Sequence, residues 1–587
     1  MTETSIICFL KNNPQLDTAA DIVEYKMLAK SHVSQAVESL IQKSMLARTA
    51  DPHDRRRQHL SLLPASAPVT DSIQAVQELF FQELFSGFTE DEQNQFFAFN
   101  QRIINNSKNM LERKKEISMT DNKDFLGREP IGKLLWTLSL PTIAAQIINM
   151  LYNIVDRIYI GHIPETGALA LTGVGVCMPL IMIVSAFAML VGNGGAPRAS
   201  IFMGKGKYED AEKILNNCFT LQLIISVVLT GILLLFNRTL LMAFGASENT
   251  IEYSVSYMNI YAIGTLFVQL TLGMNAFITA QGFAKTGMLS VLIGAVTNII
   301  LDPIFIFGLN MGVRGGALAT VLSQALSCIW VLTFLMGKKT QLRLRPNQFG
   351  LQKAIILPCV GLGTSTFIMQ SSEGIISVCF NSSLLKYGGD IAVGAMTILT
   401  SVMMFAMLPL QGLGQGAQPI ISYNYGARNP ERVKKAFWLL LKVSMAYATL
   451  LWLFIMVFPR GFAGLFTTDA ALLDFTKRAL RIYLACLLLF GIQISCQMAF
   501  NSIGYAKESI MVAVMRKFVL LIPLIYIIPR FWTGDQVSAV YMAEPVADFF
   551  AVSFTVFLFR KQFKKALESI SGKKDVLNAS GTPSAPV

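Results

Sequence analysis

The chain has 587 residues, of which 53% are hydrophobic and only 15% are charged. A soluble chain usually carries about 25% charged residues, so this composition excludes an ordinary cytosolic enzyme and indicates a polytopic membrane protein. The formal net charge is +12, but residues 1–118 hold 13 basic and 15 acidic side chains, so the positive excess lies in the remainder. Such an excess is typical of Lys- and Arg-rich cytoplasmic loops and does not indicate a nucleic-acid footprint.

Residues 1–118 form a polar segment, for which we expect a small, mostly helical piece on the cytoplasmic side, because no signal peptide opens the chain. The stretch DIVEYKMLAKSHVSQAVESLIQKSML, followed by ARTADPHDRRRQHLSLL, resembles the winged helix of MarR-type regulators. The resemblance implies a recognition helix at about Lys30–Lys43 and a wing at DPHDRR. It also implies trailing helices of a dimer interface at about 75–110.

The same resemblance implies contacts with DNA. The residues implied to face the major groove or the phosphates are Ser31, His32, Ser34, Gln35, Arg55, Arg56 and Arg57. The segment departs from the family because the first helix is missing, Ser44 replaces a Gly before the wing, and LLPAS follows the wing. Its net negative charge is also unfavourable for phosphate binding. Two alternatives therefore stay open, a DNA-binding unit and a degenerate appendage.

Long apolar runs recur from Gly132 onward, each long enough to cross about 30 Å as a helix. Open strands cannot cross lipid, so the runs must be helices. We predict twelve spans, near 134–160, 170–197, 215–236, 252–279, 286–308, 315–337, 354–381, 391–420, 436–458, 478–502, 509–530 and 536–559. Lys and Arg concentrate in the loops after even-numbered spans, which predicts a multi-pass inner-membrane protein with both termini in the cytoplasm.

The membrane part repeats itself. GGAPRASIFMGKGKYEDAEK around Gly194 matches GAQPIISYNYGARNPERVKK around Gly416, and GFAK matches GYAK, always 222 positions apart. The pattern predicts an all-α fold of two six-helix lobes in the same orientation, with a substrate path between them. We place the lobes at 134–338 and 354–565, after a junction at 119–133, with a cytoplasmic loop at 339–353 and a disordered tail at 566–587.

Polar groups inside spans mark a pathway or a coupling site, because burying them in lipid is costly. Asp156 shares a helix face with Asn149 and Asn153. Asn298 and Asp302 lie four apart, and Pro303 after them frees a backbone carbonyl. The structural alternatives are a local pair of Asp156 with its neighbouring Arg and an Asp302 that caps a helix break.

The second half of the chain carries its own set. Glu373 lies in the middle of span 7 close to Gln370, and Glu544 and Asp548 lie four apart in span 12. We regard the last two as candidate coupling residues or as helix-end structure, with equal weight. Oxygen ligands suit Na⁺ and a buried carboxylate suits a proton. No nucleotide-binding loop and no catalytic or metal-ligand motif occurs, so we expect no enzyme, no cofactor and no metal centre, but transport driven by an ion gradient.

The membrane part resembles the multidrug and toxic compound extrusion (MATE) family, MepA-like branch. The resemblance covers about 124–565 and rests on DFLGREPIGKLL, LPTIAAQIINMLYNIVDRIYIG and TNIILDPIFIFGLNMGVRGGALATVLSQ. It implies alternating access between two lobes. It also implies a cation site at four positions: Asp156, Asn298, Asp302 and Thr320. Glu373 matches the helix-7 Glu of other members, but span 10 lacks their Asp, so we expect Glu373 to face ion or cationic substrate.

The sequence thus predicts a Na⁺- or H⁺-coupled multidrug antiporter that exports organic cations. The alternatives are a lipid-linked precursor flippase of the same superfamily and a membrane-tethered MarR-type transcription regulator, and the oligomeric state stays open. Met119 stands where a stand-alone transporter of this branch would begin. We therefore hypothesise that a regulator gene and a transporter gene are joined in frame near Ser118–Thr120.

Overall fold

The computed structural model describes residues 2–26, 28–50, 58–467 and 469–571. The chain divides into two compact units, Met1–Met119 and Thr120–Val587, which we call the N-terminal unit and the membrane unit. The helix α5 (Glu90–Arg128) contains the boundary between them.

The N-terminal unit packs three short helices against a two-stranded hairpin, and a fourth helix follows. Its elements before α5 are α1 (Thr2–Asn12), α2 (Ala19–Lys26), α3 (Lys30–Gln42), β1 (Leu46–Ala50), β2 (Gln58–Leu62), η1 (Pro64–Ser66) and α4 (Ala67–Leu84). The strands are antiparallel, with Leu46 opposite Leu62 and Ala50 opposite Gln58. The core takes one apolar face from each of α1, α2 and α3, and Leu46 and Leu60 close it from the hairpin.

The turn between α3 and the hairpin explains one departure found in the sequence. Ser44 lies there with a φ of 54°, in the left-handed region. A residue with a Cβ pays about 1–2 kcal/mol in this region, whereas glycine does not. The structure therefore keeps the backbone conformation that a glycine would favour, although serine occupies the position.

The membrane unit is built of long apolar helices in two lobes. The N-lobe consists of α6 (Ile131–Gly161), α7 (Gly167–Gly204), α8 (Tyr208–Ala243), α9 (Ile251–Ala280), α10 (Ala284–Pro303), the π-helical turn η2 (Ile304–Gly308) and α11 (Val313–Met336). The turn η3 (Pro346–Gln348) lies in the connection to the C-lobe. The C-lobe consists of α12 (Lys353–Gly426), α13 (Pro430–Val457), α14 (Pro459–Gly464), α15 (Ala470–Tyr483), η4 (Leu487–Leu489), α16 (Phe490–Ile503), α17 (Ala506–Val514), the π-helical turn η5 (Met515–Leu521), α18 (Ile522–Phe531) and α19 (Gln536–Ile570).

The predicted spans reappear with two differences, and a third difference concerns the tail. Spans 7 and 8 form one helix of 74 residues, α12, which is interrupted by a non-helical Gly389 at φ 64° and ψ −160°. Span 10 is not one helix, because α15 and the segment Leu487–Ile503 meet at a bend of 42°. The tail begins later than residue 566, since α19 continues to Ile570, and residues 572–587 lie outside the described part.

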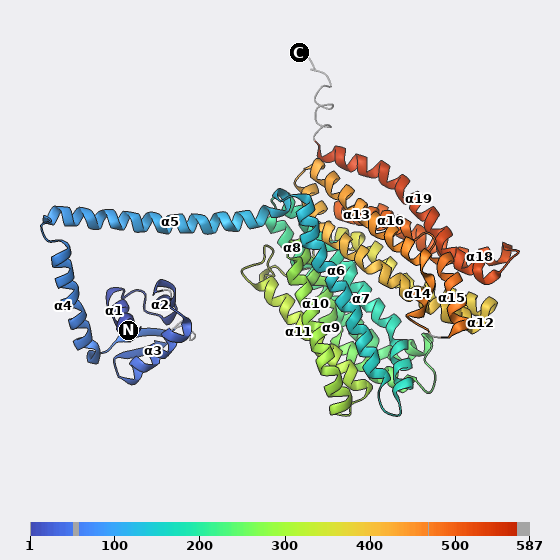
Figure 1. The fold of residues 1–587 in the computed structure, drawn as a ribbon, viewed down its shortest axis with the longest axis horizontal. Coiled ribbons are helices and arrows are strands. Elements are labelled where there is room, and N and C mark those ends of the chain that lie inside the picture. Colours follow the sequence, from blue (N-terminus) through green and yellow to red (C-terminus); the bar gives the residue numbers. More distant parts are fainter. Residues whose placement is uncertain (1, 27, 51–57, 468, 572–587) are drawn as a thin grey trace, which may run out of the picture. The chain divides into compact units, whose positions relative to one another are not determined.

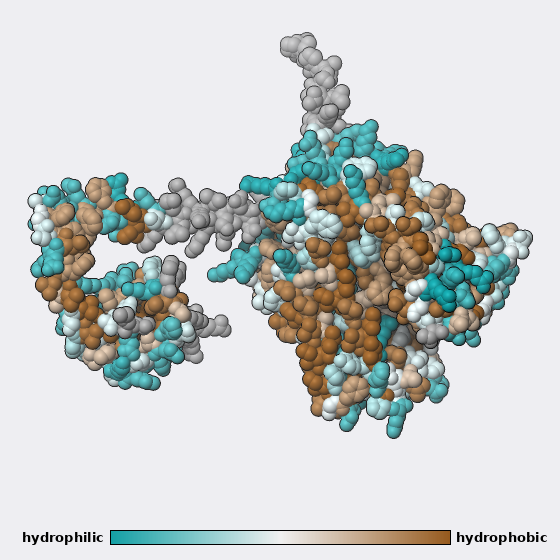
Figure 2. Space-filling view, viewed as in Figure 1, coloured by the Kyte–Doolittle hydropathy of each residue, from teal (hydrophilic) through white to brown (hydrophobic). Residues whose placement is uncertain are grey.

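Figure 1 shows the helices α6–α11 gathered on one side of the membrane unit and α12–α19 on the other. The surface of this unit is hydrophobic over the middle of the helices and hydrophilic at their ends, as Figure 2 shows. Long apolar helices with such a belt make the chain a multi-pass membrane protein.

The two lobes meet at the end of the bundle where α7 and α12 finish, which we call the basal end. A Cβ on Gly204 would overlap the carbonyl oxygen of Tyr423, and a Cβ on Gly426 would overlap that of Ile201. Each residue of one contact lies 222 positions from its counterpart in the other. The contact is therefore reciprocal, as expected when a two-fold pseudo-axis along the helices relates the lobes.

Further inter-lobe contacts lie on the basal side of the bundle. Thr142 on α6 donates a hydrogen bond of 2.7 Å to the carbonyl oxygen of Gly412 on α12. A Cβ on Gly363 would overlap the carbonyl oxygen of Leu190 on α7. The helices therefore touch backbone to backbone here, so the basal end is closed in this structure.

Candidate functional site

Three helices of the N-lobe bring the four predicted cation-site residues together. Asp156 on α6 is buried at 9% exposure, and Asn298 and Asp302 on α10 are buried at 1% and 0%. The carboxyl groups of Asp156 and Asp302 are close enough to interact electrostatically. The Asn298 Nδ2 donates to Asp302 Oδ1 at 3.3 Å and to the hydroxyl of Thr320, on α11, at 3.5 Å.

This cluster contains more oxygen acceptors than donors. Four of its buried oxygens have no hydrogen-bond partner in the structure: Asp156 Oδ1, Asn298 Oδ1, Asp302 Oδ2 and Gln324 Oε1. A buried acceptor without a donor is costly, so such a group usually binds something else. Two buried carboxyl groups this close to each other cannot both keep an uncompensated charge. The arrangement fits a site for one hard monovalent cation or a shared proton.

Local sequence explains how the side chains of α10 reach this place. Asn298 and Asp302 are four residues apart and therefore share one face of the helix. Pro303 cannot donate a backbone hydrogen bond, and the chain continues as a π-helical turn, η2, at Ile304. π-Helical turns are rare and occur frequently at functional sites.

Two neighbouring tyrosines complete the pocket. The side chain of Tyr257, on α9, lies near Thr320, and that of Tyr152 lies near Gln324. Sequence reasoning did not assign Tyr257 or Gln324 to the site. Both lie in apolar spans with no charge beside them, so only the packing of α9 and α11 against α6 and α10 identifies them.

The other predicted N-lobe residues lie on α6 nearer the basal end. Asn149 is exposed, and Asn153 donates from Nδ2 to the main-chain oxygen of Asn149 at 2.6 Å. The Asn153 amide group is therefore bound to its own helix. Their assignment to substrate stays a prediction.

The C-lobe acids lie in a different environment, because two basic side chains of η5 bind them. Arg516 donates from Nε to Asp548 at 2.8 Å and from Nη2 to Glu544 at 2.9 Å. All three side chains are at most 6% exposed. Arg516 also stacks over the ring of Phe490 at 4.7 Å. Glu544 and Asp548 thus hold a buried guanidinium in this structure.

Glu373 is bound by the adjacent residue. Lys517 donates from Nζ to Glu373 Oε1 at 2.7 Å. The Lys517 side chain is 4% exposed, whereas that of Glu373 is 54% exposed. Gln370, one turn earlier on α12, is half-buried.

Sequence reasoning missed Arg516 and Lys517. The signal was present, since two adjacent basic residues in the predicted span 509–530 are costly and need partners.

The exposed side chain of Glu373 lies beyond two inter-lobe contacts, on the side away from the basal end. Gln146 on α6 donates to Gln415 on α12 at 3.2 Å, and the rings of Phe187 on α7 and Phe367 on α12 are 4.9 Å apart. Glu373 lies less than two helical turns beyond Phe367, away from the basal end.

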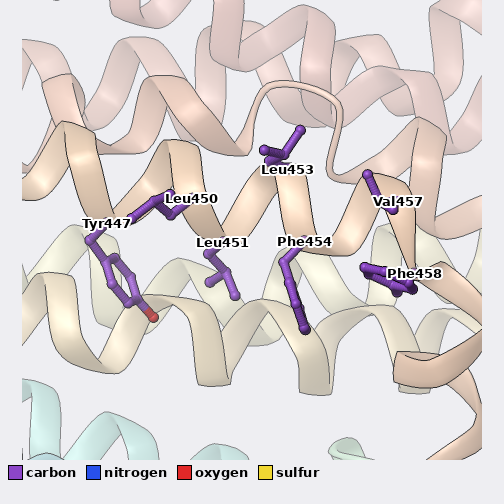
Figure 3. Close-up of a pocket in the computed structure, with 7 residues that line it drawn as sticks. All are labelled: Tyr447, Leu450, Leu451, Leu453, Phe454, Val457 and Phe458. Carbon is purple, nitrogen blue, oxygen red and sulfur yellow. The ribbon is translucent and has the colours of Figure 1, made fainter.

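A groove along α13 is a weaker candidate. Figure 3 shows its lining side chains, which run from Tyr447 on α13 to Phe458 just after its end. They are apolar except for the Tyr447 hydroxyl. Such a surface fits lipid tails better than a charged ligand.

In the N-terminal unit, the predicted DNA-reading residues of α3 lie on its exposed face. Ser31, His32, Ser34 and Gln35 are all exposed, while Val33, Ala36, Val37 and Leu40 are buried in the core. The predicted phosphate contacts Arg55, Arg56 and Arg57 lie outside the described residues. The DNA-binding role stays a prediction.

Comparison with known proteins agrees with this architecture. The relative "Multidrug export protein MepA" of Staphylococcus haemolyticus is 25% identical over 446 residues, which cover 76% of this chain and 97% of the relative. The protein of the same name from Staphylococcus aureus strain N315 is 23% identical over 406 residues, 69% of this chain and 88% of the relative.

Solved structures share the fold of the membrane unit. A crystal structure described as MATE in the bent conformation has a TM-score of 0.72 at 24% identity and covers 77% of this chain and 99% of its own. An outward-facing conformation of a multidrug resistance MATE family transporter has a TM-score of 0.71 at 24% identity, with 76% and 98% covered.

Family models match both parts of the chain. The model of the MarR family matches residues 1–57. The MatE model matches twice, at residues 141–304 and 364–527, one copy in each lobe. These two matches cover more than half of the chain, which therefore belongs to the MatE family.

Proposed function

We propose that the membrane unit is a multidrug exporter that uses an inward gradient of Na⁺ or H⁺ to expel organic cations through the inner membrane. The observation that carries this proposal is the N-lobe pair Asp156 and Asp302, two buried carboxyl groups that lie close to each other and keep oxygens without a hydrogen-bond partner. Such a pair is incomplete without a cation or a proton, so its occupancy can follow an ion gradient. The names of the similar proteins support drugs as the exported molecules.

The lobe arrangement suggests how coupling works. The basal end is closed here, and we assign it to the cytoplasm because it carries the loops richest in Lys and Arg. Both termini then lie in the cytoplasm. Binding of the ion at Asp156 and Asp302 favours one relative position of the lobes, and substrate binding favours the other. A ligand shifts such an equilibrium only by its difference in affinity between the two states.

We place the substrate between the lobes, on the side away from the basal end. Asn149, Asn153 and Gln370 offer uncharged polar groups, and Glu373 offers a carboxylate. An organic cation has a reason to bind there, because the exposed charge of Glu373 is negative.

The test is efflux of ethidium from proteoliposomes with an imposed Na⁺ or pH gradient. Asp156→Asn and Asp302→Asn are expected to abolish gradient-driven efflux while folded protein is retained. Glu252→Gln is the matched control, because this exposed acid on α9 pairs only at the surface with Arg238. Wild-type efflux from both Asp variants would end the proposal, and the gradient that drives the native protein identifies the coupling ion.

A flippase for lipid-linked precursors has less support. Its pyrophosphate ligand needs accessible positive charge, whereas Arg516 and Lys517 are buried and bound to acids. Added lipid-linked pyrophosphate that competes with ethidium would favour the flippase instead.

We propose DNA binding by the N-terminal unit as a second, separate function. The exposed polar face of α3 favours DNA binding. The opposite face of the helix is packed in the core, so the polar face is held in a fixed position and stays accessible. Fluorescence anisotropy of duplex DNA with the detergent-solubilised full chain, titrated with salt, tests it. Ser34→Glu and Gln35→Glu should weaken binding if α3 enters a groove, and no binding at low salt would exclude the function.

A further inference from the structure

The C-lobe cluster is unbalanced in charge. Arg516 binds two carboxylates, those of Glu544 and Asp548, so these three groups together carry one negative charge when ionised. Lys517 and Glu373 form a neutral pair beside them. Lys517 is close enough to interact electrostatically with Glu544 and Asp548 as well. One ammonium is therefore attracted by two partners, Glu373 on one side and the acidic trio on the other.

Access to the pair is one-sided. Lys517 is 4% exposed and cannot meet a ligand, but Glu373 is 54% exposed. Only one oxygen of Glu373, Oε1, accepts the Lys517 bond. A cation can thus approach Glu373, whereas an anion cannot approach Lys517.

We propose that Glu373 and Lys517 form an exchangeable ion pair in which Lys517 is a resident counter-ion that a monovalent organic cation displaces. When the ligand binds Glu373, the Lys517 ammonium turns to the Glu544–Asp548 side, where one negative charge is uncompensated. After the exchange the ligand neutralises Glu373 and Lys517 neutralises the remaining charge of the trio, so the displaced ammonium does not become an unpaired buried ion. A neutral ligand should not bind by this exchange, because it carries no positive charge that could replace Lys517 beside Glu373.

The backbone of η5 suits this role. Arg516 and Lys517 are consecutive and would point about 100° apart on an α-helix, but they lie in a π-helical turn with more residues per turn. The turn presents both side chains to the interior of the C-lobe. Lys517 has no rigid planar fork, so its single ammonium can change partners more readily than a guanidinium could.

This inference rests on the proposed function only for its ligand class, and binding without any gradient tests it. The experiment is equilibrium binding of ethidium to the purified full chain in detergent, followed by fluorescence. Lys517→Gln removes the competitor and is expected to tighten binding about tenfold, which corresponds to about 1.4 kcal/mol. Glu373→Gln should weaken binding about tenfold or more, and the double variant should be as weak as Glu373→Gln.

The controls separate exchange from damage to the fold. Lys386→Gln removes the same charge from an exposed site on α12 and should leave binding unchanged. Lys517→Gln should fold, because the hydrogen-bonding partner that it leaves, Glu373, is exposed. Should that variant not fold, Lys517→Arg decides: a guanidinium can bind both oxygens of Glu373, so ethidium binding should weaken. Nile red, a neutral probe, should bind all variants equally.

Unchanged or weaker ethidium binding by folded Lys517→Gln would overturn the exchange, and so would Lys517→Arg that binds as well as the native protein. If efflux still depends on Asp302 in that case, the exporter proposal survives and only the exchange fails. If Lys517→Gln tightens binding but no gradient drives efflux, the exchange stands and the coupled exporter fails.

Discussion

Replacing Arg516 by methionine tests whether the C-lobe depends on its buried cation. The guanidinium makes hydrogen bonds of 2.8 and 2.9 Å to Asp548 and Glu544, which are 4% and 5% exposed. The Arg516→Met variant keeps a side chain of similar length but leaves both carboxylates without this partner. We expect the free energy of unfolding at pH 7 to fall by about 3–5 kcal/mol, as for other broken buried ion pairs.

A loss at the upper end of this range is expected if one of the two carboxyl groups takes up a proton in the folded variant. A carboxyl group with an ordinary pKa near 4 costs about 4 kcal/mol to protonate at pH 7 and about 1–2 kcal/mol at pH 5. A variant that folds with a protonated carboxyl group binds a proton that its unfolded state does not bind at pH 7. Its stability therefore decreases as the pH rises. The deficit relative to the native protein should be smaller at pH 5 than at pH 7.

The assay is unfolding of the purified chain by denaturing detergent at both pH values. Arg530→Met, at the exposed end of α18, is the matched control and should lose little stability. The triple variant Arg516→Met, Glu544→Met, Asp548→Leu removes all three charges and should regain most of the loss, because apolar groups often replace a buried ion pair at little cost. A single variant as stable as Arg530→Met, or a triple variant as unstable as the single, would refute the reasoning.

Two more predictions concern the backbone. Gly426→Val places a side chain against the carbonyl oxygen of Ile201, so the basal end cannot close. Gradient-driven efflux should be lost while ethidium binding persists. Gly231→Val, at a position where nothing lies within 4 Å, is the control and should transport normally. Ser44→Gly relieves the left-handed backbone strain at φ 54° and should stabilise the N-terminal unit by about 1 kcal/mol. The measurement is amide hydrogen exchange in α3, which should become slower. Ser44→Ala keeps a Cβ and should give no gain in stability.

Local sequence was sufficient for the general architecture of the membrane unit. Helical spans follow from the length of each apolar run, because lipid forces every backbone group to bond within its own helix. The repeat could also be found, since close contacts between lobes require glycine at fixed places, as at Gly204 and Gly426. The break at Gly389 and the bend after Tyr483 were not predicted, because hydropathy does not report the backbone angles of a span.

Part of the N-lobe site could be predicted from the sequence, because helical spacing and the family resemblance each indicate residues of it. A four-residue spacing places Asn298 and Asp302 on one face, and the resemblance implied Asp156 and Thr320. Spacing cannot show which oxygens lack a donor, since that depends on the neighbours across α6, α9 and α11. The proximity of the two carboxyl groups is thus a result of tertiary structure alone.

The C-lobe marks the limit most clearly. The sequence shows the acids Glu373, Glu544 and Asp548, but their partners Arg516 and Lys517 lie up to 144 positions away. Nothing in the repeat predicts them, because the positions 222 residues earlier are Gly294 and Ala295. The sequence by itself determined the spans, the doubled lobes and the polar and acidic residues inside the spans, whose burial in lipid costs too much free energy to occur without a role. Only the tertiary structure decided which charges neutralise one another, because an ion pair depends on the distance between atoms and not on the distance along the chain.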